Sequence, residues 1–567
     1  MSSSRTPQVV ECVPNFSEGR DDDVIAQITG VIDTVDGAKL LDVDPGRSTN
    51  RTVVTLAGHP EAVIEAAFQA IAKAQELIDM RQHQGEHPRM GATDVCPLVP
   101  ISGITMEETV EYARRLAERV GRELDIPVFL YEHSATSPQR KNLAVIREGE
   151  YEGMAKKLQE PEWQPDYGPA ESRPKSGVTA IGARDFLIAY NVNLNTTSTR
   201  RATAVAWDVR EKGRLKREGG KPGGKLVRDA EGKRIWEPGT LPGVKAIGWF
   251  IEEYGIAQVS LNITDLEKTP VHHVFEEVAA KAAARGMRAT GSELVGLIPL
   301  SAMLDAGRHF LAKQERSLGV SEPELLTLAI KSMGLDDLAP FDPQQKIIEY
   351  RLRDAAHDPL VRMDLRRFAD ETGSESPAPG GGSVAAYLGA LGSALGTMVA
   401  NLSSHKRGWD DRWEDFSRWA ERGQVLKDEL LRLVDADTHA FNRIGDAMRL
   451  PKKTKAEKQA RAEAIAEATR GAIEVPFAVM QRALESMEVA AAMAKDGLGA
   501  SASDAGVGAL CARAAVRGAH LNVLINTADF DDQTFVDEKL AAAQKIAEEA
   551  ERREAEILSI VEERMGG

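Results

Sequence analysis

The sequence predicts a multidomain protein, with two α/β (α+β) subdomains followed by an all-α helical bundle. Strand-like and helix-like patterns alternate from residue 9 to about residue 330. From about residue 376 strand signals almost disappear, alanine is abundant, and helical periodicity continues to Glu563. The length of 567 residues also exceeds a single hydrophobic core and favours roughly three or four compact units.

The first predicted subdomain covers residues 1–180 and mixes strands with amphipathic helices. Apolar runs predict strands at 9–14, 39–44, 52–56, 98–101 and 128–131. Helical periodicity predicts helices at 22–35, 60–80 and 105–124. The last of these helices opens with Thr105 and Glu108, which have the Thr-x-x-Glu spacing of a capping box.

A second subdomain is predicted for residues 181–330, after a proline- and aromatic-rich passage at 160–169. It begins with a strand at 185–193. Residues 212–234 hold nine basic and three acidic residues among glycines. This composition indicates either a solvated surface hairpin or a patch that attracts an acidic substrate. Residues 331–375 form a predicted linker with helical stretches.

The predicted helical bundle covers residues 376–567. Amphipathic helices are expected from residue 414 onward, at 455–470, at 475–494 and at 532–564. Residues 384–402 contain no charged side chain and are long enough to span a bilayer. Their many glycines and small polar residues instead favour a closely packed helix inside a soluble protein.

Charge and cysteine content exclude several classes of protein. A formal net charge of -16 argues against a general nucleic-acid binder, because phosphates are bound by a basic face. The three cysteines form no Cys-x-x-Cys pair, so neither a disulfide framework nor a thiolate zinc site is expected, and a reducing cytoplasm fits best. The first eight residues lack an apolar core, and no secretion signal is predicted there.

A histidine-rich block at residues 83–97 lies between a predicted helix and a predicted strand. His83, Glu86 and His87 match the spacing of the inverted zinc-protease motif HxxEH. Gly85 and Pro88 disfavour the continuous helix that this motif requires. A zinc site, a structural turn and a metal-free acid–base histidine remain as interpretations. The last is favoured, because an imidazole titrates near neutral pH.

Polar residues around this block and at strand ends extend the candidate site. Glu86 and Asp94 are candidates to orient an imidazole, and Arg89 can hold a substrate carboxylate with its two-donor fork. Asn15 follows the first predicted strand and Asp44 ends the second. Active-site residues collect at such strand ends, although ordinary turn chemistry explains Asn15 and Asp44 equally well.

The motifs resemble those of a known enzyme family. The segments VECVPNFSEGR, LLDVD-PG-STNRTV and GEHPRMGATDVCP within residues 9–180, with further matches at 182–191, 247–249 and 291–299, are similar to glutamate formimidoyltransferases. The segments APGGGSVAA, LVDAD, MRLPK and LNVLIN in the C-terminal third are similar to formimidoyltetrahydrofolate cyclodeaminases. The order of the two modules resembles that of the bifunctional formimidoyltransferase-cyclodeaminase family.

This resemblance implies a folate enzyme of histidine degradation. Residues 1–180 and 181–330 would form the transferase module, which moves the formimino group of N-formimino-L-glutamate to N5 of tetrahydrofolate. Residues 376–567 would form the cyclodeaminase, which closes N10 onto that group, releases ammonia and leaves 5,10-methenyltetrahydrofolate. Tetrahydrofolate would be a polyglutamylated co-substrate, and no metal is expected. The family also implies cytoplasmic homo-oligomers joined through both modules, without a membrane span or nucleic acid.

The resemblance also places functional residues. His87 would be the catalytic base of the transferase, and Asp437 the carboxylate that takes and returns a proton in the cyclodeaminase. Gly381 and Gly382, just before a helix, could offer backbone N–H groups to an anion or could simply permit a tight turn. The other substrate-binding positions implied are Asp44, the folate-binding loop 168–177 with Gly168, Pro169, Ser176 and Gly177, and the residues Arg184, Lys452 and Asp504.

Some of these assignments have alternatives. The middle of the 168–177 loop departs from other members of the family, which leaves its individual contacts open. Lys452 belongs to a basic stretch that is either a contact for the folate glutamate tail or only a loop. The C-terminal module has two rival functions: a methenyltetrahydrofolate cyclohydrolase, or a non-catalytic scaffold for folate binding and dimerisation.

Overall fold

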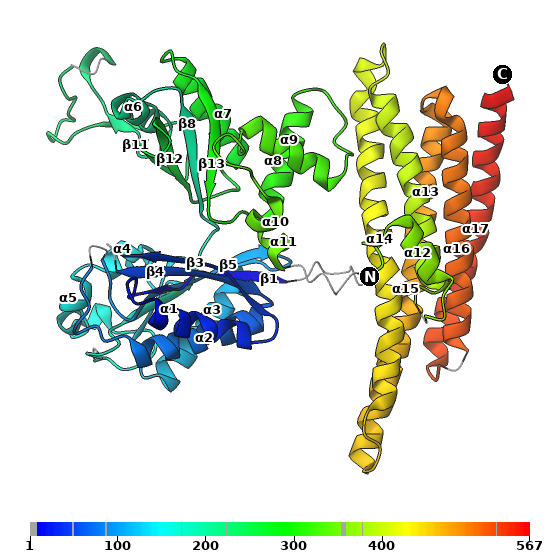
Figure 1. Cartoon of the computed structure of the whole chain (residues 1–567), viewed down its shortest axis with the longest axis horizontal. Helices are drawn as coiled ribbons and strands as arrows, with labels where there is room; N and C mark the ends of the chain where they lie inside the picture. The colour runs from blue at the N-terminus through cyan, green and yellow to red at the C-terminus, as the bar shows by residue number, and fades with distance from the viewer. Residues whose placement is uncertain are drawn as a thin grey trace. The chain divides into compact units, whose positions relative to one another are not determined.

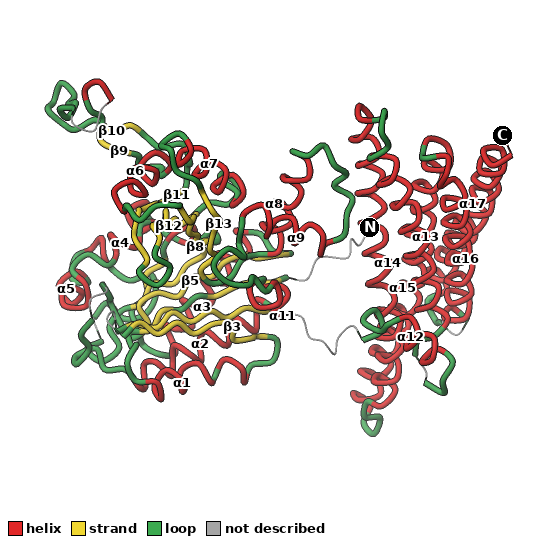
Figure 2. The backbone as a smooth tube through the Cα atoms, turned by 45° about the horizontal axis from the view of Figure 1, so that its top comes forward, coloured by secondary structure: helices red, strands yellow, loops and turns green. Residues whose placement is uncertain are grey.

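The computed structural model describes residues 8–47, 50–85, 88–171, 173–220, 224–352, 359–376, 378–528 and 530–566. The chain divides into two compact units: Met1–Ala306 with Ile330–Leu352, and Gly307–Ala329 with Arg353–Gly567. Two α/β regions precede an all-helical region (Figure 2), and the predicted fold class is confirmed. The domain boundaries at residues 180, 330 and 375 stay predictions.

The first sheet consists of β1 (Val9–Cys12), β2 (Asn15–Phe16), β3 (Ala38–Gly46), β4 (Arg51–Gly58), β5 (Thr93–Ser102), β6 (Val128–Leu130) and β7 (Thr179–Ala183). β1 and β2 both lie between β4 and β5, with which they pair antiparallel. β3 continues the sheet beyond β4. β5, β7 and β6 run parallel at the other edge, so the sheet is mixed.

Helices α1 (Asp22–Gly30), α2 (Pro60–Leu77) and α3 (Met106–Glu123) cover one face of this sheet (Figure 1). Their apolar stripes bury Ile28, Ile71 and Leu116 in one core with strand residues such as Val54. The predicted capping box of α3 is confirmed, because Thr105 and Glu108 exchange side-chain-to-backbone hydrogen bonds. The short helices α4 (Leu143–Ile146) and α5 (Glu150–Lys157) belong to a smaller core on the opposite face.

The second sheet is antiparallel and consists of β8 (Ile188–Leu194), β11 (Val244–Ile251), β12 (Ile256–Ile263) and β13 (Ala289–Val295), in the order β11-β12-β8-β13. It packs against α6 (Thr199–Val209) and α7 (Val271–Ala283). β9 (Arg214–Leu215) and β10 (Trp236–Glu237) pair antiparallel at the base of the basic segment 212–234, as expected for a hairpin. The remaining helices are α8 (Leu300–Ala312), α9 (Glu322–Met333), α10 (Pro343–Lys346) and α11 (Ile348–Leu352).

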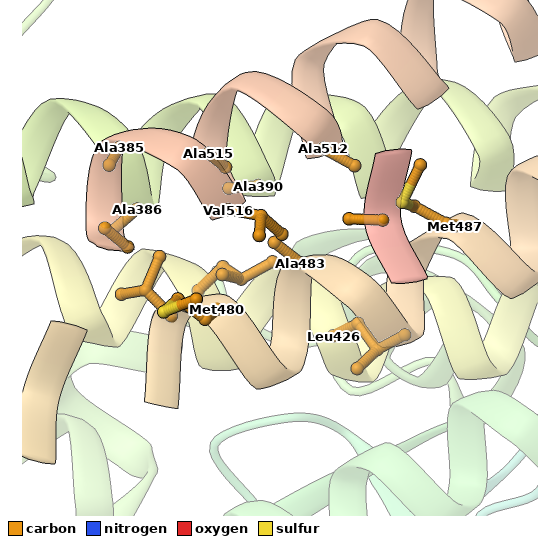
Figure 3. Close-up of a cluster of buried hydrophobic side chains, with 14 of the residues drawn as sticks. Ala385, Ala386, Ala390, Leu426, Met480, Ala483, Met487, Ala512, Ala515 and Val516 are labelled. Carbon is orange, nitrogen blue, oxygen red and sulfur yellow. The ribbon is translucent and has the colours of Figure 1, made fainter. Parts of the chain in front are cut away.

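The helical region consists of α12 (Leu365–Thr372), α13 (Gly381–Ser404), α14 (Trp413–Arg449), α15 (Lys455–Asp496), α16 (Ala502–Thr527) and α17 (Gln533–Gly566). Small side chains such as Ala386, Ala390 and Ala515 meet larger ones such as Met480 in its core (Figure 3). These small residues let the long helices approach closely, so that the core is densely packed.

Two features of this bundle bear on the sequence predictions. The charge-free segment lies in α13, which is long and apolar enough to cross a membrane, but 61% of its most apolar window is buried inside the protein. This burial agrees with the prediction of a closely packed helix. The two helices expected at 455–470 and 475–494 are one continuous helix, α15, with Pro476 inside it. Pro476 is buried, and packing along the helix retains a residue that would break an isolated one.

Candidate active sites

The first candidate site lies on the sheet face opposite α1, α2 and α3. Val54 and Leu56 of β4 point into the helix-covered core, and Arg51 of the same strand points to the other face, because strand side chains alternate. There Arg51 Nη1 donates to Asp94 Oδ2 at 2.7 Å, and Arg51 Nε donates to Asn15 Oδ1 at 2.9 Å. Burial lowers the pKa of the Arg51 guanidinium below its usual range.

Asp94 gathers two guanidinium groups around one buried carboxylate. Its side chain is 0% exposed, and it accepts hydrogen bonds from both Arg51 and Arg147. Its Oδ1 also accepts the main-chain N–H of Met90 at 3.0 Å. These partners compensate the carboxylate for its lost hydration. The resulting Arg51–Asp94–Arg147 cluster ties β4, β5 and the residue after α4 together. Asp94 was predicted from the sequence as a site residue, whereas Arg51 and Arg147 were not singled out.

The turn between α2 and β5 carries the histidine block, of which Glu86 and His87 lie outside the described residues. His83 Nε2 lies 2.8 Å from the main-chain oxygen of Asn50, and Arg89 Nε donates to His83 Nδ1 at 3.3 Å. These partners assign the ring proton to Nε2 and keep the imidazole neutral. Burial also lowers the pKa of His83, which favours the same neutral form of the ring.

This geometry bears on the zinc interpretation. Nδ1 of His83 accepts a hydrogen bond and Nε2 carries the proton, so neither nitrogen offers a lone pair to a metal ion. Within the described part of the chain, no group of three or more His, Cys, Asp or Glu side chains could hold a metal. Both ring nitrogens of His83 are thus engaged within the turn, and the expected absence of a metal stays a prediction.

The guanidinium of Arg89 is engaged by two acidic residues of α5. Glu152 accepts from Nη1 at 2.9 Å and from Nη2 at 2.7 Å, and Glu150 accepts from Nη1 at 3.0 Å. The hydrogen bond with Glu152 is the largest cause of a raised pKa at Arg89. The fork expected to hold a substrate carboxylate is thus occupied from within the protein. Substrate binding at Arg89 stays a prediction that requires Glu152 to be displaced.

Asn15 and Asp44 lie on either side of Val53 in one row across the sheet. Asn15 of β2 and Asp44 of β3 are both paired directly with Val53 of β4. Directly paired residues point to the same face, and neighbouring strands are about 5 Å apart. The two side chains therefore share a face roughly 10 Å apart. Because of this shared face, the structure brings the two predicted residues into one site. Asn15 is buried there and Asp44 is exposed.

The predicted folate-binding loop begins and ends at glycines with left-handed backbone angles, φ +81 at Gly168 and φ +69 at Gly177. Gly177 packs against the histidine turn, where an added Cβ would lie 2.3 Å from the carbonyl oxygen of Met90. Ser176 is buried beside it. Gly168 and Pro169 form the other end of the loop, and residue 172 lies outside the described residues. One end of the loop therefore borders the candidate site.

A second group of charges lies farther along the same sheet. Glu11 of β1 is only 4% exposed. Burial raises the pKa of Glu11 to about 7, an effect that Arg184 opposes and Glu349 reinforces. Arg184, which directly follows β7, was named by the sequence analysis, whereas Glu11 was missed. An acidic residue inside the apolar strand of residues 9–12 was the signal that could have identified it.

The second candidate site lies where α14 meets the start of α13. Asp437 of α14 approaches Gly382 so closely that an added Cβ would lie 2.1 Å from Asp437 Oδ1. Ser383 Oγ donates to Asp437 Oδ2 at 3.3 Å. Burial raises the pKa of Asp437, and side-chain and main-chain hydrogen bonds from Ser383 oppose this shift. A carboxyl group of raised pKa can accept and return a proton near neutral pH.

Two further residues surround this site. Asp435 is buried, and its carboxylate accepts the main-chain N–H groups of Leu360 at 2.9 Å and Val361 at 3.1 Å. Asn522 of α16 lies close to the start of α13, with its Nδ2 3.8 Å from an added Cβ at Gly381. The site therefore joins α13, α14, α16 and the segment that precedes α12.

The structure separates the other two predicted residues from Asp437. Asp504 lies in the first turn of α16, 18 residues before Asn522, which at 1.5 Å per residue corresponds to roughly 27 Å. Lys452 is exposed in the turn between α14 and α15. The end of α14 is 12 residues beyond Asp437, or about 18 Å along the helix. Within one chain, Asp504 and Lys452 therefore lie well away from Asp437 along their helices, and their part in substrate binding stays a prediction.

Comparison with known families accounts for nearly the whole chain. Residues 9–184 match the N-terminal subdomain of the formiminotransferase domain, residues 189–353 match the formiminotransferase domain, and residues 364–545 match formiminotransferase-cyclodeaminase.

One relative matches nearly the whole chain, and two others each match one part of it. A formimidoyltransferase-cyclodeaminase of Gallus gallus is 43% identical over 558 residues, 98% of this chain and 99% of that protein. A glutamate formimidoyltransferase of Streptococcus pyogenes serotype M1 is 43% identical over 54% of this chain and 95% of its own length. A methenyltetrahydrofolate cyclohydrolase of Methylorubrum extorquens is 37% identical over 33% of this chain and 89% of its own length.

Fold and sites together define a two-module enzyme, with one polar site on an α/β sheet and one carboxylate site in a helical bundle. The match over 98% of the chain includes both modules. The chain belongs to the formimidoyltransferase-cyclodeaminase family.

Proposed function

We propose roles for individual residues in two consecutive reactions on tetrahydrofolate. As a member of its family, the protein is a transferase and a lyase of histidine catabolism. It transfers the formimino group of N-formimino-L-glutamate to tetrahydrofolate and then cyclises the product with loss of ammonia. The carboxylate of Asp437 against the start of α13 is the observation that best supports a residue assignment.

In the transfer step, N5 of tetrahydrofolate attacks the formimino carbon and forms the new N–C bond. The proton on N5 passes to His87, and the same proton returns to the glutamate nitrogen as its C–N bond breaks, which releases glutamate. Its position in the family motif supports this role for His87. Asn15 and Asp44 share a sheet face with Arg51 and are proposed to bind the substrates there.

In the cyclisation step, N10 of protonated 5-formiminotetrahydrofolate attacks the formimino carbon, and Asp437 takes the N10 proton. Asp437 then gives this proton to the former imino nitrogen. The C–N bond breaks, ammonia leaves, and the ring retains the positive charge as 5,10-methenyltetrahydrofolate. One carboxyl group thus accepts and returns one proton, a role that its raised pKa favours. No metal takes part in either proposed step.

Two variants of the full chain test these assignments separately. His87→Ala should abolish transfer and leave ammonia release from added 5-formiminotetrahydrofolate intact. Asp437→Asn should do the reverse, because an amide of the same shape cannot carry the proton. Each variant controls for the folding of the other module. A transferase that stays active in His87→Ala, or a deaminase that stays active in Asp437→Asn, would refute the corresponding assignment.

The named activity of the Methylorubrum extorquens relative favours one alternative, a cyclohydrolase activity in the helical module. Water would then open the methenyl bridge instead of N10 closing it. Ammonia release and methenyltetrahydrofolate hydrolysis, measured side by side on the full chain, distinguish the two. Ammonia release that depends on Asp437 supports deamination, whereas hydrolysis without ammonia supports the alternative.

We propose that tetrahydrofolate binds in its polyglutamylated form. Lys452 and Lys453 are exposed in the turn between α14 and α15, and Lys455 is exposed at the start of α15. A chain of glutamates can reach them there without entering the Asp437 site. Lys452→Glu should raise KM for pentaglutamyl 5-formiminotetrahydrofolate and leave the monoglutamyl KM unchanged. An equal change for both substrates would contradict this proposal.

We propose that the protein forms homo-oligomers through both modules. Leu521 and Ile525 of α16 are 64% and 73% exposed. In the second sheet, Ile247 and Trp249 of β11 are 56% and 39% exposed. Apolar surface of this extent marks contact regions, and a second copy can bury the same residues symmetrically. Ile525→Asp should reduce the mass seen by sedimentation velocity, and an unchanged mass would exclude this helix face.

We propose a cytoplasmic location. Cys12, Cys96 and Cys511 are free thiols, and reduced cysteines are typical of that compartment. Fluorescent tagging in the native cell tests this, and a signal outside the cytoplasm would contradict it.

A further inference from the structure

Ser383 holds a hydroxyl proton that has a choice of acceptors. The side chain is 0% exposed, and its hydrogen-bond partners are protein groups. Its Oγ lies 2.8 Å from the main-chain oxygen of Val434, 3.3 Å from Asp437 Oδ2 and 3.4 Å from Thr438 Oγ1. A hydroxyl has one proton and can donate a strong hydrogen bond to only one of these acceptors at a time.

The preferred acceptor depends on the charge of Asp437. Hydrogen bonds to an ionised carboxylate are about twice as strong as those between neutral groups. When Asp437 is ionised, its oxygen is therefore the better acceptor for Ser383. When Asp437 carries a proton, the shorter bond to the Val434 carbonyl is the better one. A small rotation about the Cα–Cβ bond of Ser383 exchanges the two arrangements, without movement of either helix.

We propose that Ser383 is a positioning residue of the cyclodeaminase site, whose hydroxyl follows the proton on Asp437. It donates to the ionised carboxylate before N10 is deprotonated and returns to the Val434 carbonyl while Asp437 holds the proton. This inference rests on the proposed role of Asp437. It adds a residue that keeps the base ionised in a buried place, although Ser383 itself does not transfer a proton to the substrate.

Among the groups around Asp437, Ser383 is the one that stabilises the ionised carboxylate. Burial raises the pKa of Asp437, and the opposing effects are the two hydrogen bonds from Ser383. On α14, Asp435 and His439 are two residues away and project in other directions around the helix. On α13, Tyr387 follows Ser383 by one turn and packs against Phe368.

Two other polar side chains near the site, among the residues that the structure describes, have partners of their own. The carboxylate of Asp435 accepts the main-chain N–H groups of Leu360 and Val361, which ties it to the segment before α12. Asn522 approaches from α16 with a neutral amide, whose Nδ2 donates to the main-chain oxygen of Gly518. Ser383 is therefore the side chain whose removal should change the titration of Asp437 most directly.

The test compares two serine-to-alanine variants on one helix. Ser383→Ala removes the hydroxyl beside Asp437. Ser393→Ala removes an equally buried hydroxyl of α13, which donates to the main-chain oxygen of Gly423 at 2.9 Å and lies roughly 15 Å from Ser383 along the helix. Ammonia release from 5-formiminotetrahydrofolate is measured against pH for the full-length proteins, and transferase activity of the same samples reports that each chain is folded.

Loss of a hydrogen bond to the charged form raises a carboxyl pKa. The acid limb of kcat/KM should therefore move to higher pH by about half a unit to one unit in Ser383→Ala. In Ser393→Ala it should coincide with the wild type, even where Tm falls by the same amount in both variants. Ser383→Cys replaces the hydroxyl with a slightly larger group that is a much weaker donor, and it should show the same shift as Ser383→Ala.

The outcomes separate this inference from the assignment of Asp437. If Asp437→Asn still releases ammonia, the catalytic assignment fails. If Asp437→Asn is inactive but the acid limb of Ser383→Ala coincides with that of the wild type, the role of Ser383 is refuted. Should Ser383→Ala not fold, an unshifted limb in Ser383→Cys refutes it equally. An equal shift in Ser393→Ala would also overturn it, because general loosening of α13 would then explain the effect.

Discussion

Gly382→Ala tests the close approach of α13 to the carboxylate of Asp437. An added Cβ would lie 2.1 Å from Asp437 Oδ1, 2.5 Å from Cγ and 2.6 Å from Oδ2. Ordinary contact begins at 3.4 Å, so the carboxylate or the helix must retreat by about 1.3 Å, the difference between 3.4 and 2.1 Å. Misplacement of a reacting group by about 1 Å can reduce a rate roughly 100-fold. Overpacking of this kind also lowers stability by about 1–3 kcal/mol.

The expected result is a loss of ammonia release by about two orders of magnitude, with transferase activity unchanged in the same protein. Two glycine-to-alanine changes serve as controls. At Gly445 of α14 an added Cβ meets nothing within 4 Å, so both activities should persist. At Gly381 its nearest neighbour is Asn522 Nδ2 at 3.8 Å, so Tm should not fall. Near-normal ammonia release by folded Gly382→Ala would refute the assigned position of the carboxylate.

Three further predictions concern the transferase module. Asp94→Asn should lower the free energy of unfolding by about 3–5 kcal/mol in urea titrations, because Arg51 and Arg147 keep buried charges without their carboxylate; a change below 1 kcal/mol would contradict the cluster. The pKa of Glu11 is about 7 in the folded protein against 4.5 in the unfolded chain. Its contribution to stability is thus complete below pH 4.5 and is lost as the pH rises through 7, a loss of about 3 kcal/mol. Glu11→Gln should remove this pH dependence, as shown by unfolding at pH 5 and pH 8, and a wild-type dependence would count against the buried carboxyl. Elemental analysis of the purified protein should find no stoichiometric zinc, since both ring nitrogens of His83 are engaged; one zinc per chain would restore the metal interpretation.

Features encoded locally were predicted best. The capping box of α3 needs only Thr105 and Glu108, three residues apart, and it forms as predicted. The packed interior of α13 followed from a run of small, uncharged residues. Local rules failed just before Pro476, where the sequence predicted two separate helices at 455–470 and 475–494. The helix continues there because its buried side chains pack against the bundle on both sides of the proline.

Contacts between distant segments could not be predicted. The partners of Asp94 are 43 and 53 residues away in sequence, and no local pattern marks Arg51 or Arg147 as a pair. The neutral form of His83 depends on Asn50, which is 33 residues away. The spacing of the HxxEH motif does not predict that contact. Family motifs identified the segments that form the candidate sites, but the tertiary fold determines which side chains are in contact.

The bond between Asp435 and the backbone at Leu360 and Val361 sets a limit on how the helical module can be isolated. A fragment beginning at residue 376, where helical periodicity starts, would lack both donors. It would leave a buried anion unsatisfied two residues from Asp437, at a cost of about 1–3 kcal/mol or more. A fragment that retains these two hydrogen bonds has to begin before residue 360. If a shorter fragment were inactive, the result would not test the chemistry of the site.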